Sequence, residues 1–340
     1  MATIRDVAEK AGVSVATVSH VVNGSRRVSP EVKARVLKAI AALKYRRDGI
    51  ARSLRMSQTR TIGLMISDIS NPFFADFVRG IEDAVHARDP NYNLILCNSE
   101  EQEDKERRLF DVVLEKRVDG IVIVPAGGNR DYLNDLIGTG LPVVFADRFL
   151  PGLDADAVIV DNRDASFRLV THLVRLGHRR IAALNAHLAA TSIRERIEGY
   201  RDALEAAGIP FDERLVVTSR SRIEDAVVAG SEVLDLRPAP TAAFCTNNFM
   251  TLGLIRALSD RGLRCPEDMA VIGFDDFPWA STFRPRLTVV SQPSYALGQE
   301  AANLLFDRLL KKRTGPPVRL TLGTSLIIRE SCGAHARVPA

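Results

Sequence analysis

The sequence predicts a small α-helical head followed by an α/β body made of two doubly wound parallel-sheet lobes. Residues 1–60 hold 13 Lys and Arg against 4 Asp and Glu, a net charge of +9, whereas the other 280 residues carry −5. Short apolar stripes at helical spacing fill the head, and from residue 61 onward β-rich runs alternate with amphipathic stretches. A basic head on an acidic body indicates a polyanion as the partner of the head.

Length and composition set the outer limits of this organisation. A chain of 340 residues with 46% hydrophobic residues is long enough for two or three domains. We assign residues 1–45 to the head, 46–60 to a hinge and linker, 61–331 to the two-lobed body and 332–340 to a tail. No apolar run reaches membrane-spanning length and the first residues are unlike a signal peptide, so we expect a cytoplasmic protein. The four cysteines are far apart, so we expect no disulfide framework, metal site or cofactor.

Three short helices account for the head. Thr3 is a suitable N-cap for a first helix that ends at Gly12, and Ser14 can cap a second helix after a turn of three residues. Ser29 and Pro30 begin a third helix in the way that a capping residue followed by proline commonly does. Two helices joined by so tight a turn form a helix-turn-helix pattern. Periodicity alone also allows a helical dimerisation or docking module.

In the body, eight apolar runs read as strands and six amphipathic stretches read as helices. Almost continuously apolar strands that alternate with helices indicate parallel sheets covered on both faces. The predicted strands are residues 61–67, 93–98, 120–125, 142–147, 157–160, 180–185, 242–247 and 270–274. The predicted helices are residues 73–88, 104–116, 165–176, 194–207, 249–260 and 295–310.

Polar and aromatic side chains gather just beyond these strands, where such folds bind ligands. Carboxylates, amides and guanidinium groups next to aromatic rings suit a polyhydroxylated ligand, because hydroxyls need donors and acceptors while a sugar ring stacks on an aromatic face. Helix capping is the alternative role for any one of them. They are Asp68, Asn71, Phe73, Phe74, Asp147, Arg148, Asp161, Asn162, Arg194, Arg196, Asn247, Asn248, Asp275, Asp276 and Gln292.

The head closely resembles the DNA-binding domain of the lac repressor/gal repressor family. The resemblance is carried by TIRDVAEKAGVSVATVSHVVNG at residues 3–24, VSP at 28–30 and AIAALKY at 39–45. It implies that the second helix enters the major groove, where Val15 and Ala16 read bases by apolar contact and His20 by hydrogen bonding. Val15 could instead belong to the apolar stripe of the helix. The remaining DNA contacts implied for the head are Thr3, Ser14, Thr17, Ser19, Asn23, Ser25 and Arg26.

The basic stretch RRDGIARSLR at residues 46–55 resembles the hinge helix of the same family. By that resemblance it orders in the minor groove of operator DNA, with Leu54 as a wedge between base steps and Arg52 and Arg55 beside phosphates. Without the resemblance, the stretch reads as a charged linker.

The body resembles the effector domain of this family, which has the fold of periplasmic sugar-binding proteins. The matching stretches are SNPFF at residues 70–74, KRVDG at 116–120, LGHRRI at 176–181, RIEGY at 196–200, GFDD at 273–276, LT at 287–288 and QP at 292–293. The implied effector contacts are Asn71, Phe73, Phe74, Asp147, Arg148, Arg196, Asn247 and Asp275.

One position departs from the family pattern. Relatives commonly carry an aromatic residue that covers the ligand where this chain has Ser221 between Arg220 and Arg222. We therefore expect Arg220 or Arg222, together with Arg148, to meet an anionic group of the effector, such as a sugar acid or sugar phosphate.

These observations predict a transcriptional regulator, most simply a repressor of sugar catabolism genes, that binds a palindromic operator as a homodimer and responds to a sugar-like effector. A purine-type corepressor or a phosphoprotein co-regulator remains an alternative within the family. An enzyme is disfavoured because the chain lacks phosphate-binding and nucleophile motifs, and a free-standing sugar-binding protein has no need of the basic head.

Overall fold

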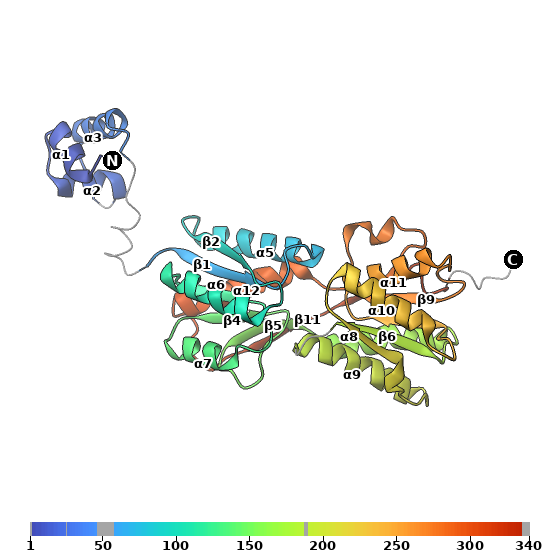
Figure 1. Ribbon diagram of the computed structural model, residues 1–340. Helices are drawn as coiled ribbons and strands as arrows, with labels where there is room; N and C mark the ends of the chain where they lie inside the picture. The colour runs from blue at the N-terminus through green and yellow to red at the C-terminus, as the bar shows by residue number, and fades with distance from the viewer. Residues whose placement is uncertain (1, 25, 46–57, 187–189, 335–340) are drawn as a thin grey trace. The chain divides into compact units, whose positions relative to one another are not determined.

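The computed structural model describes residues 2–24, 26–45, 58–186 and 190–334. It divides into two compact units, Met1–Thr59 and Arg60–Ala340 (Figure 1). The predicted hinge residues Arg52, Leu54 and Arg55, and the predicted contact Ser25, lie outside the described residues.

The first unit is the predicted three-helix head, formed by α1 (Ile4–Ala11), α2 (Val15–Asn23) and α3 (Pro30–Ala42). Thr3 caps α1 through a reciprocal capping box with Asp6. The helix ends at Ala11, and Gly12 follows it as the C-cap at a φ of 61°, a conformation that favours glycine and that sets the short turn to α2. The core of the head consists of Val7, Ala8, Ala11, Val18, Val36 and Ala39.

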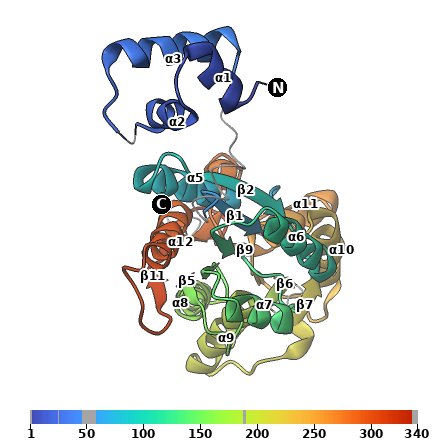
Figure 2. The same cartoon turned by 90° about the vertical axis from the view of Figure 1, so that its left-hand side faces the viewer.

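The first lobe of the body is a six-stranded parallel sheet with helices on both faces (Figure 2). Helices α5 (Pro72–Arg88) and α12 (Ser294–Leu309) pack together on one face, and α6 (Glu103–Glu115) and α7 (Arg130–Gly138) cover the other. Across the sheet the strands run β11 (Arg319–Leu322), β5 (Asp156–Val160), β4 (Val143–Ala146), β3 (Gly120–Ile123), β1 (Thr61–Ile66) and β2 (Asn93–Asn98).

The second lobe repeats this plan. Helices α8 (Asn162–Arg175) and α9 (Thr191–Ala206) cover one face of its sheet, and α10 (Ile223–Asp235) and α11 (Asn248–Asp260) cover the other. All its strand pairs are parallel except that of β12 with β10. The strand order is β12 (Ser325–Ile327), β10 (Thr288–Ser291), β9 (Ala270–Phe274), β8 (Ala242–Cys245), β6 (Ile181–Ala186) and β7 (Val216–Ser219).

The chain passes between the lobes three times: after β5, after β10, and between β11 and β12. Each lobe is therefore assembled from segments that are far apart in the sequence. All eight predicted strands are present, but β7, β10, β11 and β12 were not predicted. Strands β7 and β11 are half exposed, so their sequences lack the continuous apolar run used to identify the others.

The predicted tail begins too early. Cys332 is 1% exposed and belongs to the core of the second lobe, where its Sγ lies 3.3 Å from Nε2 of His172. The body thus includes a residue that the sequence alone assigned to the tail.

Candidate functional site

Helix α2 carries the residues predicted to read DNA. Ser14 caps it by accepting a hydrogen bond from the Thr17 backbone at 3.1 Å, and its Oγ lies 2.9 Å from the Thr17 hydroxyl. Val15 is 41% exposed whereas Val18 is fully buried, so Val15 is a surface residue of the helix rather than part of its core stripe. Ala16 and Arg26 are exposed, and Ser19 and His20 are half-buried; the side chain of Asn23 lies outside the described part of the chain.

Thr3 has a structural role at the start of α1. Its hydroxyl accepts a hydrogen bond from the Asp6 backbone, and its own backbone N–H donates to the Asp6 carboxylate at 2.7 Å. That backbone hydrogen bond is the main reason why the pKa of Asp6 lies below its ordinary value. Thr3 therefore fixes the first helix whether or not it also contacts a phosphate.

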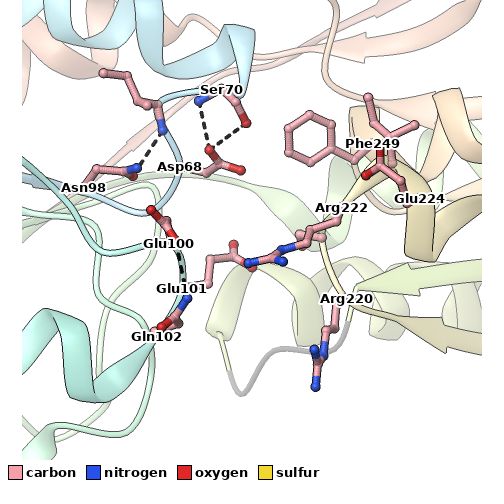
Figure 3. A pocket seen from close by; sticks show the side chains of 13 residues that line it. Asp68, Ser70, Asn98, Glu100, Glu101, Gln102, Arg220, Arg222, Glu224 and Phe249 are labelled. Carbon is pink, nitrogen blue, oxygen red and sulfur yellow. Dashed lines mark hydrogen bonds between the residues drawn. The ribbon is translucent and has the colours of Figure 1, made fainter.

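A cavity of about 890 Å³ lies between the two lobes, at the carboxyl ends of the strands (Figure 3). Segments 68–70 and 98–102 line it from the first lobe, and segment 220–224 and Phe249 line it from the second. A smaller hollow of about 340 Å³ is lined by Ser70, Phe73, Asp275, Gln292 and Trp279, among others. Ser70 lines both spaces, so the two hollows adjoin.

Arg196 is the most constrained charged group of this region. Its guanidinium is 3% exposed, donates to Asn162 Oδ1 at 2.9 Å and to the Thr246 carbonyl at 2.8 Å, and lies 3.7 Å from the centre of the Phe274 ring. Burial lowers the pKa of Arg196, while the carboxylates of Asp275 and Asp147 act in the opposite direction. A buried guanidinium near carboxylates can bind a polar ligand in two ways: the guanidinium donates hydrogen bonds to it, and the carboxylates accept hydrogen bonds from it.

Asp275 lies next to Arg196 with only 5% of its surface exposed. Its Oδ1 accepts a hydrogen bond from Gln292 Nε2 at 2.5 Å, and its backbone is in the left-handed region at a φ of 75°. Burial raises the pKa of Asp275, and the nearby Arg196 and Gln292 oppose this rise. The predicted pair of Arg196 and Asp275 is thus brought together.

The raised pKa of Asp275 leads to a pH-dependent prediction for Asp275→Asn. Because the folded pKa lies above the unfolded one, the wild type loses stability as the pH rises through the folded value, whereas the amide variant does not. We expect the variant to be more stable than the wild type at pH 7, with the difference vanishing below about pH 3, where the carboxyl group is protonated in both the folded and the unfolded state. Urea unfolding at several pH values measures this difference. A variant that is less stable at pH 7 than at pH 3, relative to wild type, contradicts the prediction.

Arg148 is already paired within its own lobe. It is 4% exposed and lies 3.5 Å from Glu101 and 4.0 Å from the Asp147 carboxylate. Burial raises the pKa of Glu101. The charge of Arg148 and a hydrogen bond with Ser221 oppose this rise. Glu101 was not among the predicted site residues, although its position just after β2 satisfies the same strand-end rule.

Asn71 and Asn247 both serve as helix caps at the edge of the cleft. Asn71 Oδ1 accepts from the Phe73 backbone at 3.0 Å, and Asn247 Oδ1 accepts from the Met250 backbone at 2.9 Å. The Asn247 amide also donates to the Ser221 hydroxyl at 3.3 Å. Both residues therefore have the structural role of helix capping, which the sequence analysis gave as the alternative to ligand contact.

The two phenylalanines after Asn71 are mainly core residues. Phe73 is 7% and Phe74 is 4% exposed, and both rings pack on Phe77. Phe73 also lines the smaller hollow and offers it an apolar face.

Arg220 and Arg222 line the large cavity, but acidic side chains line it as well. Figure 3 shows Arg222 directed toward the loop of Glu100 and Glu101. The hydrogen bond from Lys105 is the main reason why the pKa of Glu100 lies below its ordinary value, and Arg222 lowers this pKa further. Four carboxylates, those of Asp68, Glu100, Glu101 and Glu224, share the lining with the two guanidinium groups. Arg148 also lies near two carboxylates, but its Nε is buried without a hydrogen-bond partner among the described residues, so the anionic effector stays a prediction.

Other types of functional site are not indicated in the described residues. They include no group of three or more His, Cys, Asp or Glu side chains arranged to hold a metal ion. No helix among them is long and apolar enough to cross a membrane.

A helix-turn-helix head joined to a two-lobed α/β body with a polar cleft defines a ligand-regulated DNA-binding protein. Comparison with known families agrees with this class: residues 3–48 match the bacterial regulatory proteins of the lacI family, and residues 59–327 match the periplasmic binding proteins and sugar-binding domain of the LacI family. The chain belongs to the LacI family, as a DNA-binding transcriptional repressor and not an enzyme.

Individual relatives span nearly the whole chain. The HTH-type transcriptional repressor PurR of Vibrio atlanticus (strain LGP32) is 37% identical over 92% of this chain and 93% of its own length. PurR of Haemophilus influenzae (strain PittEE) is 35% identical over 97% of this chain and 98% of its own length. Among solved structures, the transcriptional regulator CelR–cellobiose complex is 34% identical, with a TM-score of 0.74 over 97% of this chain and 100% of that one. The structure of the Lac repressor dimer bound to operator and the anti-inducer ONPF is 27% identical. Its TM-score is 0.84 over 97% of this chain and 99% of that one.

Proposed function

We propose that this repressor binds a palindromic operator as a homodimer in the cytoplasm, and that a purine-type small molecule in the inter-lobe cleft controls its operator affinity. The observation that carries this proposal is the near full-length similarity to repressors named PurR, at 37% identity for the Vibrio atlanticus protein. It favours the purine-type alternative over the sugar effector expected from the sequence.

The chemistry of the cleft is compatible with a purine. Purine edges present ring N–H donors beside carbonyl and ring-nitrogen acceptors. The Asp275 carboxylate can accept from such donors, and Arg196 has guanidinium N–H groups beyond the two engaged by Asn162 and Thr246. Phe73 supplies an apolar surface at the smaller hollow. A flat heterocycle with polar edges would satisfy these groups together.

A sugar is the second candidate, and one specific observation favours it. The CelR structure that resembles this chain over 97% of its length was solved with cellobiose. The large cavity is lined mainly by polar side chains, and hydroxyl groups can both donate to its carboxylates and accept from its arginines.

Operator binding with and without effector distinguishes these candidates. The full chain is used to select a palindrome from random duplexes, and its affinity is then measured by fluorescence anisotropy with hypoxanthine, guanine, ribose or cellobiose. We expect a purine base to change operator affinity by at least about tenfold, an energetic coupling of about 1.4 kcal/mol. A response to ribose or cellobiose alone supports the sugar candidate, and the absence of any selected palindrome contradicts the repressor assignment.

A further inference from the structure

The strands of the first lobe are all parallel, so their amino ends lie together at one end of the lobe, and the chain enters the body there. Arg60, the first residue of the second unit, directly precedes β1. Its backbone N–H donates to Asp119 Oδ2 at 2.9 Å, and its guanidinium lies 3.9 Å from the Asp89 carboxylate. Asp89 is the C-cap of α5 and Asp119 directly precedes β3, so the entry point contacts two other segments of this end.

The loop after α12 belongs to the same end of the lobe. Arg88, at the end of α5 and next to Asp89, donates from its guanidinium to the Asp307 carboxylate in the last turn of α12 at 3.2 Å. The Asp307 carbonyl in turn accepts a hydrogen bond from the Arg313 backbone N–H at 3.0 Å. Residues 311–313, called the basic loop below, therefore lie at the end of the lobe at which the chain enters.

The basic loop consists of three exposed cations in succession, Lys311, Lys312 and Arg313, the only run of three Lys or Arg residues in the sequence. Their side chains form no salt bridge with any of the described residues. Two carboxylates close to the loop are already paired, Asp307 with Arg88 and Asp156 with Arg308. The loop thus places three unpaired positive charges on a body whose net charge is −5.

The fold does not use these three side chains. Arg308, in the last turn of α12, already supplies the cation that favours a helix C-terminus. Its guanidinium donates to Asp156 at 2.7 and 2.8 Å and to the carbonyl oxygens of Gly315 and Pro316 at 2.6 and 3.0 Å, so it holds both the helix end and the loop. Lys311 has a φ of 54°, a conformation that favours glycine, so a lysine there does not stabilise the turn. The charges of the basic loop therefore indicate a partner outside the body.

We propose that the basic loop binds the phosphates of the DNA that adjoins the operator. The head is the DNA-binding unit, and the 14 residues 46–59 connect it to Arg60 at this end of the body. A chain of that length spans at most about 50 Å, so DNA held by the head stays within that distance of the point where the body begins. Exposed Lys and Arg side chains bind phosphates whatever the base sequence. The contact rests on the repressor assignment and is independent of the effector.

A matched pair of triple variants isolates this contact. The test variant combines Lys311→Gly, Lys312→Gln and Arg313→Gln, and glycine suits the left-handed backbone at position 311. The control variant removes the same amount of charge from exposed positions of the second lobe, as Arg175→Gln, Arg214→Gln and Arg237→Gln. Urea unfolding verifies that both variants remain folded.

Binding of the full chain to DNA is measured by fluorescence anisotropy over a range of salt concentrations. One duplex holds the selected palindrome alone, and the other extends it on each side by about 15 base pairs of random sequence, a length of about 50 Å. We expect the wild type and the control variant to bind the extended duplex at least about tenfold more tightly at low salt, and the test variant to bind both duplexes equally. Each lost phosphate contact lowers the salt dependence by about 0.9, so the test variant should lose about 2 to 3 in the slope of log K against log salt on the extended duplex alone.

The possible outcomes separate this contact from the repressor assignment. A test variant that gains as much from the extension as the wild type overturns the contact and leaves the repressor assignment in place. A control variant that loses the gain as well shows an effect of total charge, which also overturns the contact. If no palindrome is selected, the repressor assignment fails and the contact fails with it.

Discussion

Replacing Arg196 with alanine is expected to lower the free energy of unfolding of the body by about 3 kcal/mol or more and to abolish the response to effector. The substitution removes two hydrogen bonds and the contact with the Phe274 ring. It also leaves Asp275 buried without the positive charge that opposes the rise of its pKa. Removing a positive charge that acts on a buried carboxylate is costly because the carboxylate remains desolvated.

Two measurements on Arg196→Ala separate stability from function. Urea unfolding gives the stability change, and calorimetry below the unfolding transition should show effector affinity reduced at least about 100-fold. Arg196→Lys is the control, because it retains the charge but cannot reproduce the forked contacts with Asn162 and Thr246. An alanine variant with wild-type effector affinity would show that Arg196 only supports the fold.

Val18→Asp is expected to abolish operator binding while leaving effector binding intact. Val18 is fully buried in a small head core, in which the described residues include six buried side chains, and an unpaired carboxylate there should unfold the head. The body is a separate compact unit and should keep its cleft. Operator affinity should fall at least about 100-fold by fluorescence anisotropy, with unchanged calorimetric titration of the effector.

Val15→Ala provides the comparison for Val18→Asp. Val15 is 41% exposed on the same helix, so its truncation should leave the head folded and weaken only the base contacts predicted for its methyl groups. If Val18→Asp binds the operator normally, the head is not the DNA-binding unit.

Sequence reasoning predicted the fold better than the site. The capping residues and Gly12 define the head helices locally, and the apolar runs of the central strands identify both sheets. Arg196 and Asp275 were predicted as effector contacts from the family resemblance, and that role stays a prediction. The pairing of Arg148 with Glu101 was not predictable, because it depends on side chains from separate loops that only the folded sheet brings together.

The same limit applies to Asn248. Its hydrogen bond to Asn71 was not predictable, because the two residues are 177 positions apart in the sequence. The acids around Arg220 and Arg222 were not predictable for a related reason: the two arginines are close together in sequence, whereas most of the acids that line the cavity with them come from the other lobe.

The three passages between the lobes also constrain how the protein is made. The core of the first lobe includes Leu297, Leu305 and Phe306 of α12, and its edge strand β11 ends at Leu322. The ribosome must therefore synthesise the entire central part of the second lobe, residues 162–291, before the first lobe can be completed. Strand β12 follows β11 almost immediately, so both lobes receive their last strands within a few residues of each other. The head can fold early in translation, but the two lobes must become complete nearly together, late in synthesis.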